Sequence, residues 1–196
     1  MATTARLTRA ERSAQTRREL LEAAQRHFFE AGYHATTIAD IADAAGYTKG
    51  AVYSTFASKA GLFLALFDDI VDQRLAATRA IVDAENSRSE ASLRALADQP
   101  VEQRNARFLL LSIEFWLHAA REPALLDAFS ERYRRLRASL AQLTPADSPI
   151  APERWALLTL ALSNGFALER LIDPEGVPGD LMGDVQRRLL APDPPA

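Results

Sequence analysis

Apolar residues recur three and four positions apart along most of this 196-residue chain, which is the spacing of an α-helix with one buried face. The first stripe contains Leu20, Leu21, Ala24 and Phe28, and Gly32 follows it where a helix C-terminal cap belongs. Alternating runs of β-branched residues, which would indicate strands, are few. The pattern therefore predicts helices rather than a sheet.

Three further stripes and a set of prolines divide the rest of the chain. No proline precedes Pro100, so the first half can hold long uninterrupted helices. Proline-rich stretches predict a loop over residues 144–152, a turn over 173–179 and an irregular end. The stripes are Leu62, Phe63, Leu66, Phe67, Ile70, Val71 and Leu75; Phe108, Leu111 and Phe115; and Leu125, Phe129 and Leu136. We predict an all-α fold of about nine helices.

A short helix and a tight turn are expected after the first stripe. Thr37 and Asp40 have the spacing of a capping box, in which each residue satisfies a backbone N–H group of the other. Ile38 and Ile41 then give the helix a small apolar face. Gly46 permits the left-handed backbone that a turn needs here.

A second short helix follows, with Thr48 as its N-terminal cap and Val52 and Phe56 on its inner face. Two short helices joined by such a turn make a helix-turn-helix, whose second helix enters the DNA major groove by its N-terminal end. Small residues there let the backbone approach DNA, and hydroxyl and ammonium groups supply contacts. The residues at this end are Tyr47, Thr48, Lys49, Gly50 and Ala51.

The two lysines of the chain, Lys49 and Lys59, flank this second helix. Lys59 follows Ser58, which is the expected cap of the next helix. A helix N-terminus beside a cation is a phosphate site, and lysine serves as a flexible point charge there. We therefore expect both lysines to contact DNA.

Composition narrows the class of protein. Hydrophobic residues make up 48% of the chain and charged residues 25%, as in a soluble protein with a substantial core. The absence of cysteine and the scatter of the three histidines predict no metal site, and we expect no cofactor. No signal segment or run of eighteen apolar residues occurs, so we expect a cytoplasmic protein without a membrane partner.

Charge is distributed unevenly. Residues 1–60 hold eight Lys or Arg and six Asp or Glu, whereas the remainder holds fifteen and twenty. Residues 1–18 alone carry five arginines and one glutamate. This basic arm suits an anionic partner at the N-terminal end, although from charge alone a solvated basic tail is an equal alternative.

The segment "LLEAAQRHFFEAGYHATTIADIADAAGYTKGAVYSTFASKAGLFLALFD" resembles the DNA-binding domain of the TetR family of transcriptional regulators. The likeness covers about 50 residues and rests on "GYHATT", "IADAAG", "TKGAVYSTF" and "SKAGLF" at the family's spacing. The resemblance implies a helix-turn-helix domain over residues 1–57 and an effector-binding, dimerisation domain over 58–196. It also implies a bacterial protein, associated with the nucleoid when bound to DNA.

The resemblance also assigns roles to single residues. It implies that Thr37, Tyr53 and Lys59 bind phosphates and that Thr48, Lys49 and Ala51 face bases or backbone. Many members have histidine where this chain has Ser54, which implies a shorter or missing phosphate contact. Many also have glutamate at the place of Gly61, so the cap of Ser58 lacks its reciprocal partner. We expect a loose first turn here, and we expect Gly61→Glu to restore the capping box.

The segment 155–172 is apolar on nearly all sides, so it must be covered on two faces. A single deep monomer core is one solution. A dimer interface with the next helix is preferred, because a helix-turn-helix protein usually needs two half-sites. The expected interface residues are Leu162, Phe166, Leu181, Val185 and Leu189.

Ligand pockets are mostly apolar and contain a few specifically positioned polar groups. Side chains with a polar end among apolar residues therefore indicate a pocket in the C-terminal part. An apolar or aromatic effector is therefore expected. Glu114 and Asn164 are polar candidates nearby. The candidate pocket residues are Phe108, Leu111, Phe115, Trp116, His118, Phe129, Tyr133, Trp155, Thr159 and Ser163.

These features predict a ligand-responsive transcriptional regulator, most simply a repressor that binds a palindromic operator as a homodimer and is released by a small molecule. An activator, or a helical protein of this fold without an effector, is the alternative. The sequence argues against an enzyme, because it shows no phosphate-binding loop, nucleophile motif or metal-ligand spacing.

Overall fold

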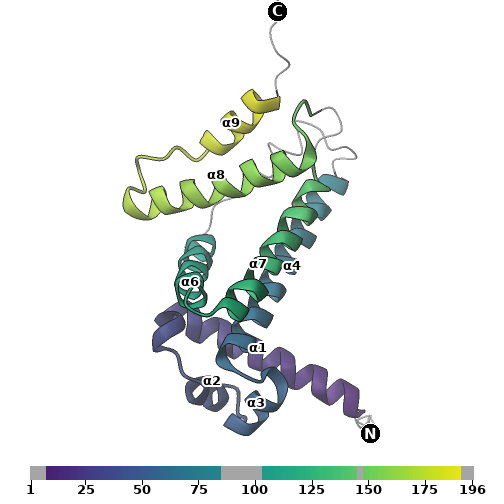
Figure 1. Cartoon of the computed structure of the whole chain (residues 1–196), viewed down its shortest axis with the longest axis vertical. Helices are drawn as coiled ribbons and strands as arrows, with labels where there is room; N and C mark the ends of the chain where they lie inside the picture. Colours follow the sequence, from purple (N-terminus) through teal and green to yellow (C-terminus); the bar gives the residue numbers. More distant parts are fainter. Residues whose placement is uncertain (1–7, 85–102, 145–147, 191–196) are drawn as a thin grey trace, which may run out of the picture. The chain divides into compact units, whose positions relative to one another are not determined.

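The computed structural model describes residues 8–84, 103–144 and 148–190. These residues form eight α-helices and no strand (Figure 1), which confirms the all-α class and comes close to the predicted number of helices. The chain divides into two compact units, Met1–Asp69 and Ile70–Ala196. The division falls within the long helix α4 (Lys59–Ala84).

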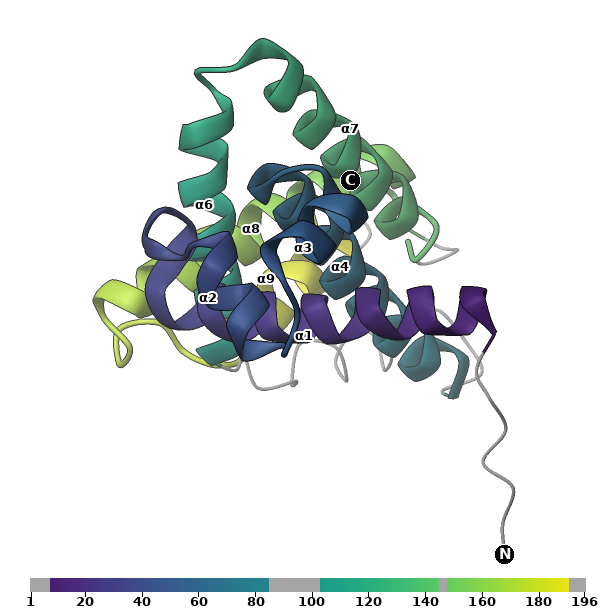
Figure 2. The same ribbon diagram turned by 90° about the horizontal axis from the view of Figure 1, so that it is seen from below.

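The N-terminal unit is built from α1 (Arg9–Ala35), α2 (Ile38–Ala44), α3 (Lys49–Phe56) and the first part of α4. Figures 1 and 2 both show α2 and α3 lying beside α1. The predicted first stripe is buried, and the Phe28 ring meets the Phe63 ring edge-on at 6.0 Å between centroids. Hydrophobic burial between α1 and α4 therefore forms the core against which the two short helices lie.

Gly32 has a positive φ of 80° and interrupts the regular helix, which agrees with its predicted place at a helix C-terminus, and a further short helical stretch then reaches Ala35. The buried Thr36 hydroxyl lies 3.0 Å from the His27 carbonyl oxygen and 2.8 Å from that of Gly32. It therefore donates to carbonyl groups at the point where the helical hydrogen bonds are interrupted. Of the predicted basic arm, residues 1–7 lie outside the described residues, and Arg9 onward is helical.

The C-terminal unit contains the rest of α4 with α6 (Gln103–Ala119), α7 (Pro123–Ala141), α8 (Pro152–Ile172) and α9 (Leu181–Leu190). Helix α8 contacts α6, α7 and α9. The core of the C-terminal unit contains Phe115, Phe129 and Trp155, all of which are buried. The proline-rich segments separate α7 from α8 and α8 from α9, as predicted.

Within the described ranges, no single helix is long and apolar enough to cross a membrane. Helix α3 and residues 59–80 of α4 reach the required length and composition only together, and they are bent by 64° at their junction.

Candidate nucleic-acid interface and ligand-binding unit

The helix-turn-helix forms as its capping residues predict. The Asp40 N–H donates to the Thr37 hydroxyl oxygen at 3.2 Å, and the Thr37 N–H donates to the Asp40 carboxylate at 3.0 Å. Gly46 makes the turn with a φ of 73°. The Ala51 N–H then donates to the Thr48 hydroxyl at 3.2 Å, which starts α3. These local bonds fix where each short helix begins.

Helix α3 is held to the unit by one face. Val52 and Phe56 are buried, as predicted, and Arg17 of α1 places its guanidinium 4.9 Å from the centre of the Phe56 ring. An eight-residue helix is too short to be stable alone, so these contacts keep it folded.

The start of α3 and the face beyond it are exposed. Among the predicted DNA contacts, Ala51 is half-buried and the following five are exposed: Thr48, Lys49, Gly50, Tyr53 and Ser54. Tyr53 is 51% exposed. Neither the Lys49 ammonium nor the Tyr53 hydroxyl forms a hydrogen bond or ion pair with the described residues. Since they stand one helical turn apart, the two donors share one side of α3.

The hydroxyls of Thr37 and Ser54, both predicted DNA contacts, already donate within the protein. The Thr37 hydroxyl donates to the Asp40 carboxylate at 2.7 Å, and the bonds from Thr37 hold the pKa of Asp40 below its usual range. The Ser54 hydroxyl donates to the Ala51 carbonyl at 2.9 Å. Because a hydroxyl has one proton, either residue must give up its internal bond in order to donate to a phosphate.

Tyr47 points to α1. Its hydroxyl donates to the Glu19 carboxylate and accepts from the Thr16 hydroxyl at 3.3 Å. The bond from Tyr47, followed by that from Gln15 at 2.9 Å, lowers the pKa of Glu19. Tyr47 is half-buried, unlike the exposed residues that follow it. The sequence identified Tyr47 as important but did not reveal this partner, which is 28 residues away.

Lys59 also has internal partners. Its ammonium donates to the His34 carbonyl at 3.2 Å and lies 4.6 Å from the centre of the Tyr33 ring. A cation at the end of α1 stabilises the helix by meeting its unpaired carbonyls. The Ser58 hydroxyl accepts from the Gly61 N–H at 2.9 Å, so Ser58 caps α4 as predicted.

The expectation that Gly61→Glu would restore a capping box at this helix start is wrong. A Cβ atom at Gly61 would overlap the backbone carbonyl oxygen of Phe56. That same oxygen accepts from the Ser58 N–H at 2.7 Å across Ala57, whose φ is 62°. Glycine is therefore required where the turn between α3 and α4 closes on itself, and Gly61→Glu cannot restore a capping box without moving the turn.

A short helix with free donors at its exposed start, held by a turn to a second helix, is the arrangement of a sequence-reading DNA-binding domain. Residues 20–66 match the model for bacterial regulatory proteins of the tetR family, and residues 85–192 match that for the C-terminal part of BetI-type transcriptional repressors. The chain belongs to the TetR family of transcriptional regulators, and it is not an enzyme.

Individual relatives agree with this class. The chain is 30% identical over 190 residues to the transcriptional regulator TtgR of Pseudomonas putida, covering 90% of this chain and 89% of that one. A TetR-family regulator from Rhodococcus has the same fold, with a TM-score of 0.74 at 17% identity over 91% of this chain and all of that one. A regulator from Saccharomonospora viridis solved with choline has a TM-score of 0.67 at 21% identity, covering 89% and 95%.

Part of the predicted effector set forms an aromatic cluster in the C-terminal unit. The Phe129 ring meets Phe115 at 5.2 Å and Tyr133 at 5.1 Å, both nearly edge-on. Burial raises the pKa of Tyr133. Phe108 and Leu111 are buried too, and the Arg74 guanidinium lies 4.4 Å from the centre of the Phe108 ring.

The remaining predicted effector residues are scattered. Trp116 is 55% exposed and Ser163 is exposed, so neither belongs to the buried cluster. His118 Nε2 lies 3.8 Å from the Glu122 carboxylate near the surface, whereas Trp155 is buried. The Thr159 hydroxyl oxygen is buried and makes no hydrogen bond to the described residues.

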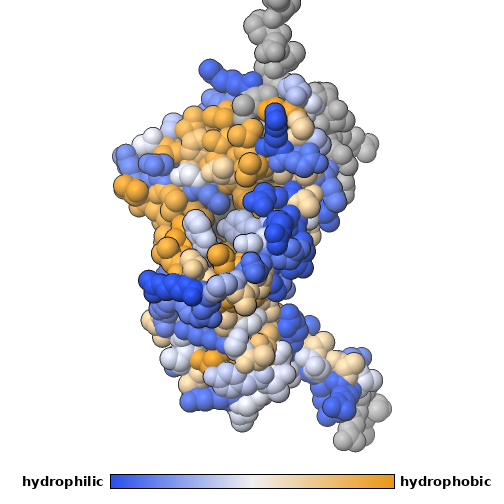
Figure 3. All heavy atoms as spheres, in the orientation of Figure 1, coloured by the Kyte–Doolittle hydropathy of each residue, from blue (hydrophilic) through white to orange (hydrophobic). Residues whose placement is uncertain are grey.

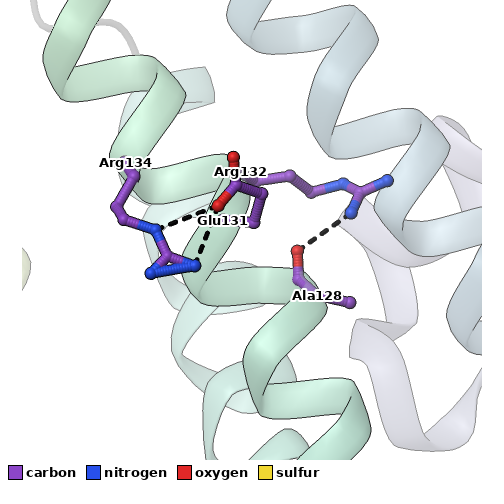
Figure 4. A network of polar contacts seen from close by, with 4 residues as sticks. All are labelled: Ala128, Glu131, Arg132 and Arg134. Atoms are coloured by element: carbon purple, nitrogen blue, oxygen red, sulfur yellow. Dashed lines mark hydrogen bonds and ion pairs between the residues drawn. The ribbon is translucent and has the colours of Figure 1, made fainter.

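A groove of about 710 Å³ lies elsewhere in this unit, between the end of α7 and the start of α8. None of the ten predicted effector residues lines it. One of its two guanidinium groups, that of Arg134, already pairs with Glu131 at 2.8 Å, beside the bond from Arg132 to the Ala128 carbonyl (Figure 4). The groove and the predicted effector residues therefore do not coincide. Its lining residues are Arg134, Arg137, Ala138, Ala141, Gln142, Pro152, Glu153 and Leu157.

Helix α8 carries an exposed apolar surface, which Figure 3 shows as a gathering of hydrophobic residues over this part of the chain. The predicted interface residues Leu162, Phe166, Leu181 and Val185 are only half-buried, and the side chain of Leu189 is not among those described. More exposed leucines and an isoleucine extend the surface along α8. We call this set the α8 surface: Leu157, Leu158, Leu168, Leu171 and Ile172.

Proposed function

We propose that this regulator is a repressor that binds a palindromic operator as a homodimer and leaves it when a small molecule binds the C-terminal unit. The observation that carries the proposal is the exposed side of α3, where the Lys49 ammonium and the Tyr53 hydroxyl form no hydrogen bond or ion pair with the described residues. An unpaired ammonium and phenol on one side of a recognition helix fit base edges and phosphates.

Replacement of Lys49 by alanine tests the proposal that α3 binds DNA. We expect a loss of about 1–3 kcal/mol in binding free energy for a DNA duplex selected by the wild-type chain. A base contact would relax the preference at one position of each half-site. A phosphate contact would instead lower the slope of log affinity against log salt concentration by about one for each subunit. Fluorescence anisotropy over a salt series measures both quantities.

Arg135→Ala is the matched control, because it also removes one positive charge from an exposed position but lies on α7 in the other unit. It should leave affinity nearly unchanged. Equal affinities for the wild-type chain and the Lys49 variant would mean that α3 does not read DNA by this end.

The homodimer is supported by the α8 surface. Contiguous exposed apolar residues on a regulator indicate a protein interface, and two copies would cover one another's surface. A dimer also supplies two reading helices, which a palindromic operator requires.

The effector we propose is neutral and largely apolar or aromatic. The buried rings of Phe115 and Phe129 and the half-buried ring of Tyr133 suit such a ligand, and the Thr159 hydroxyl offers a polar contact. The half-buried Arg74 cation on the Phe108 ring disfavours a cationic ligand nearby. In a reporter assay the chain should lower expression and a neutral aromatic compound should restore it. Restoration by choline instead would contradict this class of effector.

A further inference from the structure

One turn of α1 contacts both ends of the recognition helix. Tyr47 immediately precedes the cap of α3, and its hydroxyl is bonded to Thr16 and Glu19. Phe56 is the last residue of α3, and its ring lies under the Arg17 guanidinium at 4.9 Å. We call Thr16, Arg17 and Glu19 the α1 brace. Both views of the ribbon show α3 lying beside α1 (Figures 1 and 2).

The recognition helix needs such support. It has only eight residues, and Val52 and Phe56 are its buried side chains. Apolar contacts lack direction, so two buried residues allow a short helix to tilt or slide. Hydrogen bonds to base edges require donor–acceptor distances within a few tenths of an ångström, so a small tilt weakens sequence reading.

The bonding of the Tyr47 phenol opposes a direct role in binding DNA. The hydroxyl has one proton, which it donates in the hydrogen bond to the Glu19 carboxylate. The other oxygen of the Glu19 carboxylate accepts from Gln15 at 2.9 Å, so the carboxylate is held on α1 from both sides. A hydrogen bond to a charged acceptor is stronger than a neutral one, and a phosphate contact by Tyr47 would require breaking it.

We infer that Tyr47 and Glu19 are positioning residues that set the orientation of α3 for operator recognition, and that Tyr47 does not itself contact DNA. This inference rests on the proposed function of α3. It predicts that the two residues act together and that they affect binding to the operator more than binding to unrelated DNA.

A double-mutant cycle tests the inference in the full-length chain. Tyr47→Phe keeps the ring and removes the hydroxyl, and Glu19→Ala removes the acceptor from the helix surface. Affinities are measured for the selected operator and for an unrelated duplex of equal length. We expect each single variant to bind the operator about three- to tenfold more weakly and the double variant to lose little more. Binding to the unrelated duplex should stay within about twofold, because its phosphate contacts carry no sequence information.

Two further variants complete the design. Thr16→Val keeps the shape of the side chain and should show a smaller operator-specific loss that disappears in the Tyr47→Phe background. Tyr53→Phe removes the exposed hydroxyl of α3 and should weaken binding to both duplexes alike, as a direct phosphate contact does. Far-ultraviolet circular dichroism confirms that each variant is folded.

The outcomes separate the possibilities. Coupled, operator-specific losses support the inference. Equal losses on both duplexes, additive effects of Tyr47→Phe and Glu19→Ala, or no loss at all would overturn it while the proposed function stands. A wild-type chain that binds both duplexes equally would overturn the proposed function and the inference together.

Discussion

Leu168→Glu should convert the regulator to a monomer and lower its operator affinity by about 10²–10⁴-fold. Leu168 is part of the α8 surface and is exposed in the single chain, so a carboxylate is tolerated before association. In the proposed dimer the same charge would be buried without a partner, which costs several kcal/mol. Loss of the second reading helix then removes the gain from simultaneous binding to two half-sites.

Sedimentation equilibrium and operator titration measure the two effects. The variant should have a mass near 21.6 kDa, and the wild type should have twice that mass. Leu117→Glu is the matched control, because Leu117 is 61% exposed but lies on α6. A dimeric Leu168 variant, or a monomeric Leu117 variant, would place the interface away from α8.

Gly61→Ala should lower the free energy of unfolding by about 1–3 kcal/mol and displace the turn between α3 and α4. The added methyl group meets the Phe56 carbonyl oxygen, which is backbone and cannot rotate away as a side chain does. The turn is already tight, because Ala57 is held at a φ of 62°.

Urea unfolding measures this change, with Gly50→Ala as the control in the same unit. A Cβ atom at Gly50 lies 3.7 Å from the Thr48 hydroxyl oxygen, in ordinary contact. Alanine there should be neutral or stabilise α3 by up to about 1 kcal/mol. If Gly61→Ala and Gly50→Ala had the same free energy of unfolding, the close approach to Phe56 would not restrict position 61 to glycine.

The local features of the N-terminal unit could be predicted from the sequence. Capping by Thr37 and Thr48, the left-handed turn at Gly46 and burial of Val52 and Phe56 all depend on residues within one or two turns of each other. Such short-range hydrogen bonds and periodicities are encoded in the spacing of a few residues.

Features that depend on distant partners could not be predicted. The bond of Tyr47 to Glu19 and that of Lys59 to His34 join residues 28 and 25 positions apart. The requirement for glycine at position 61 comes from the backbone of the preceding helix, whereas the spacing of Ser58 and Gly61 indicates only a helix cap.

The C-terminal unit was less predictable for a different reason. Helix α8 is apolar on nearly all sides, so periodicity does not indicate which side faces its own core. Leu162 and Phe166 were expected at the interface and are half-buried, whereas Leu168 and Ile172 are more exposed. Similarly, the spacing of α6 did not reveal that Trp116 is exposed while Phe115 is buried.

Selection of bound sequences from a random pool of duplex DNA tests the central claim most directly. If two copies of α3 read DNA from a symmetric dimer, the recovered sequences should contain an inverted repeat. Its half-sites should lie about one helical turn apart, or a multiple of it, with centres about 34–36 Å apart per turn. If Lys49 contacts a base, sequences selected by Lys49→Ala should keep the inverted repeat but lose the preference at one position of each half-site. Recovery of sequences with no shared motif, or of a single half-site without its inverted partner, would contradict a dimeric DNA-reading regulator.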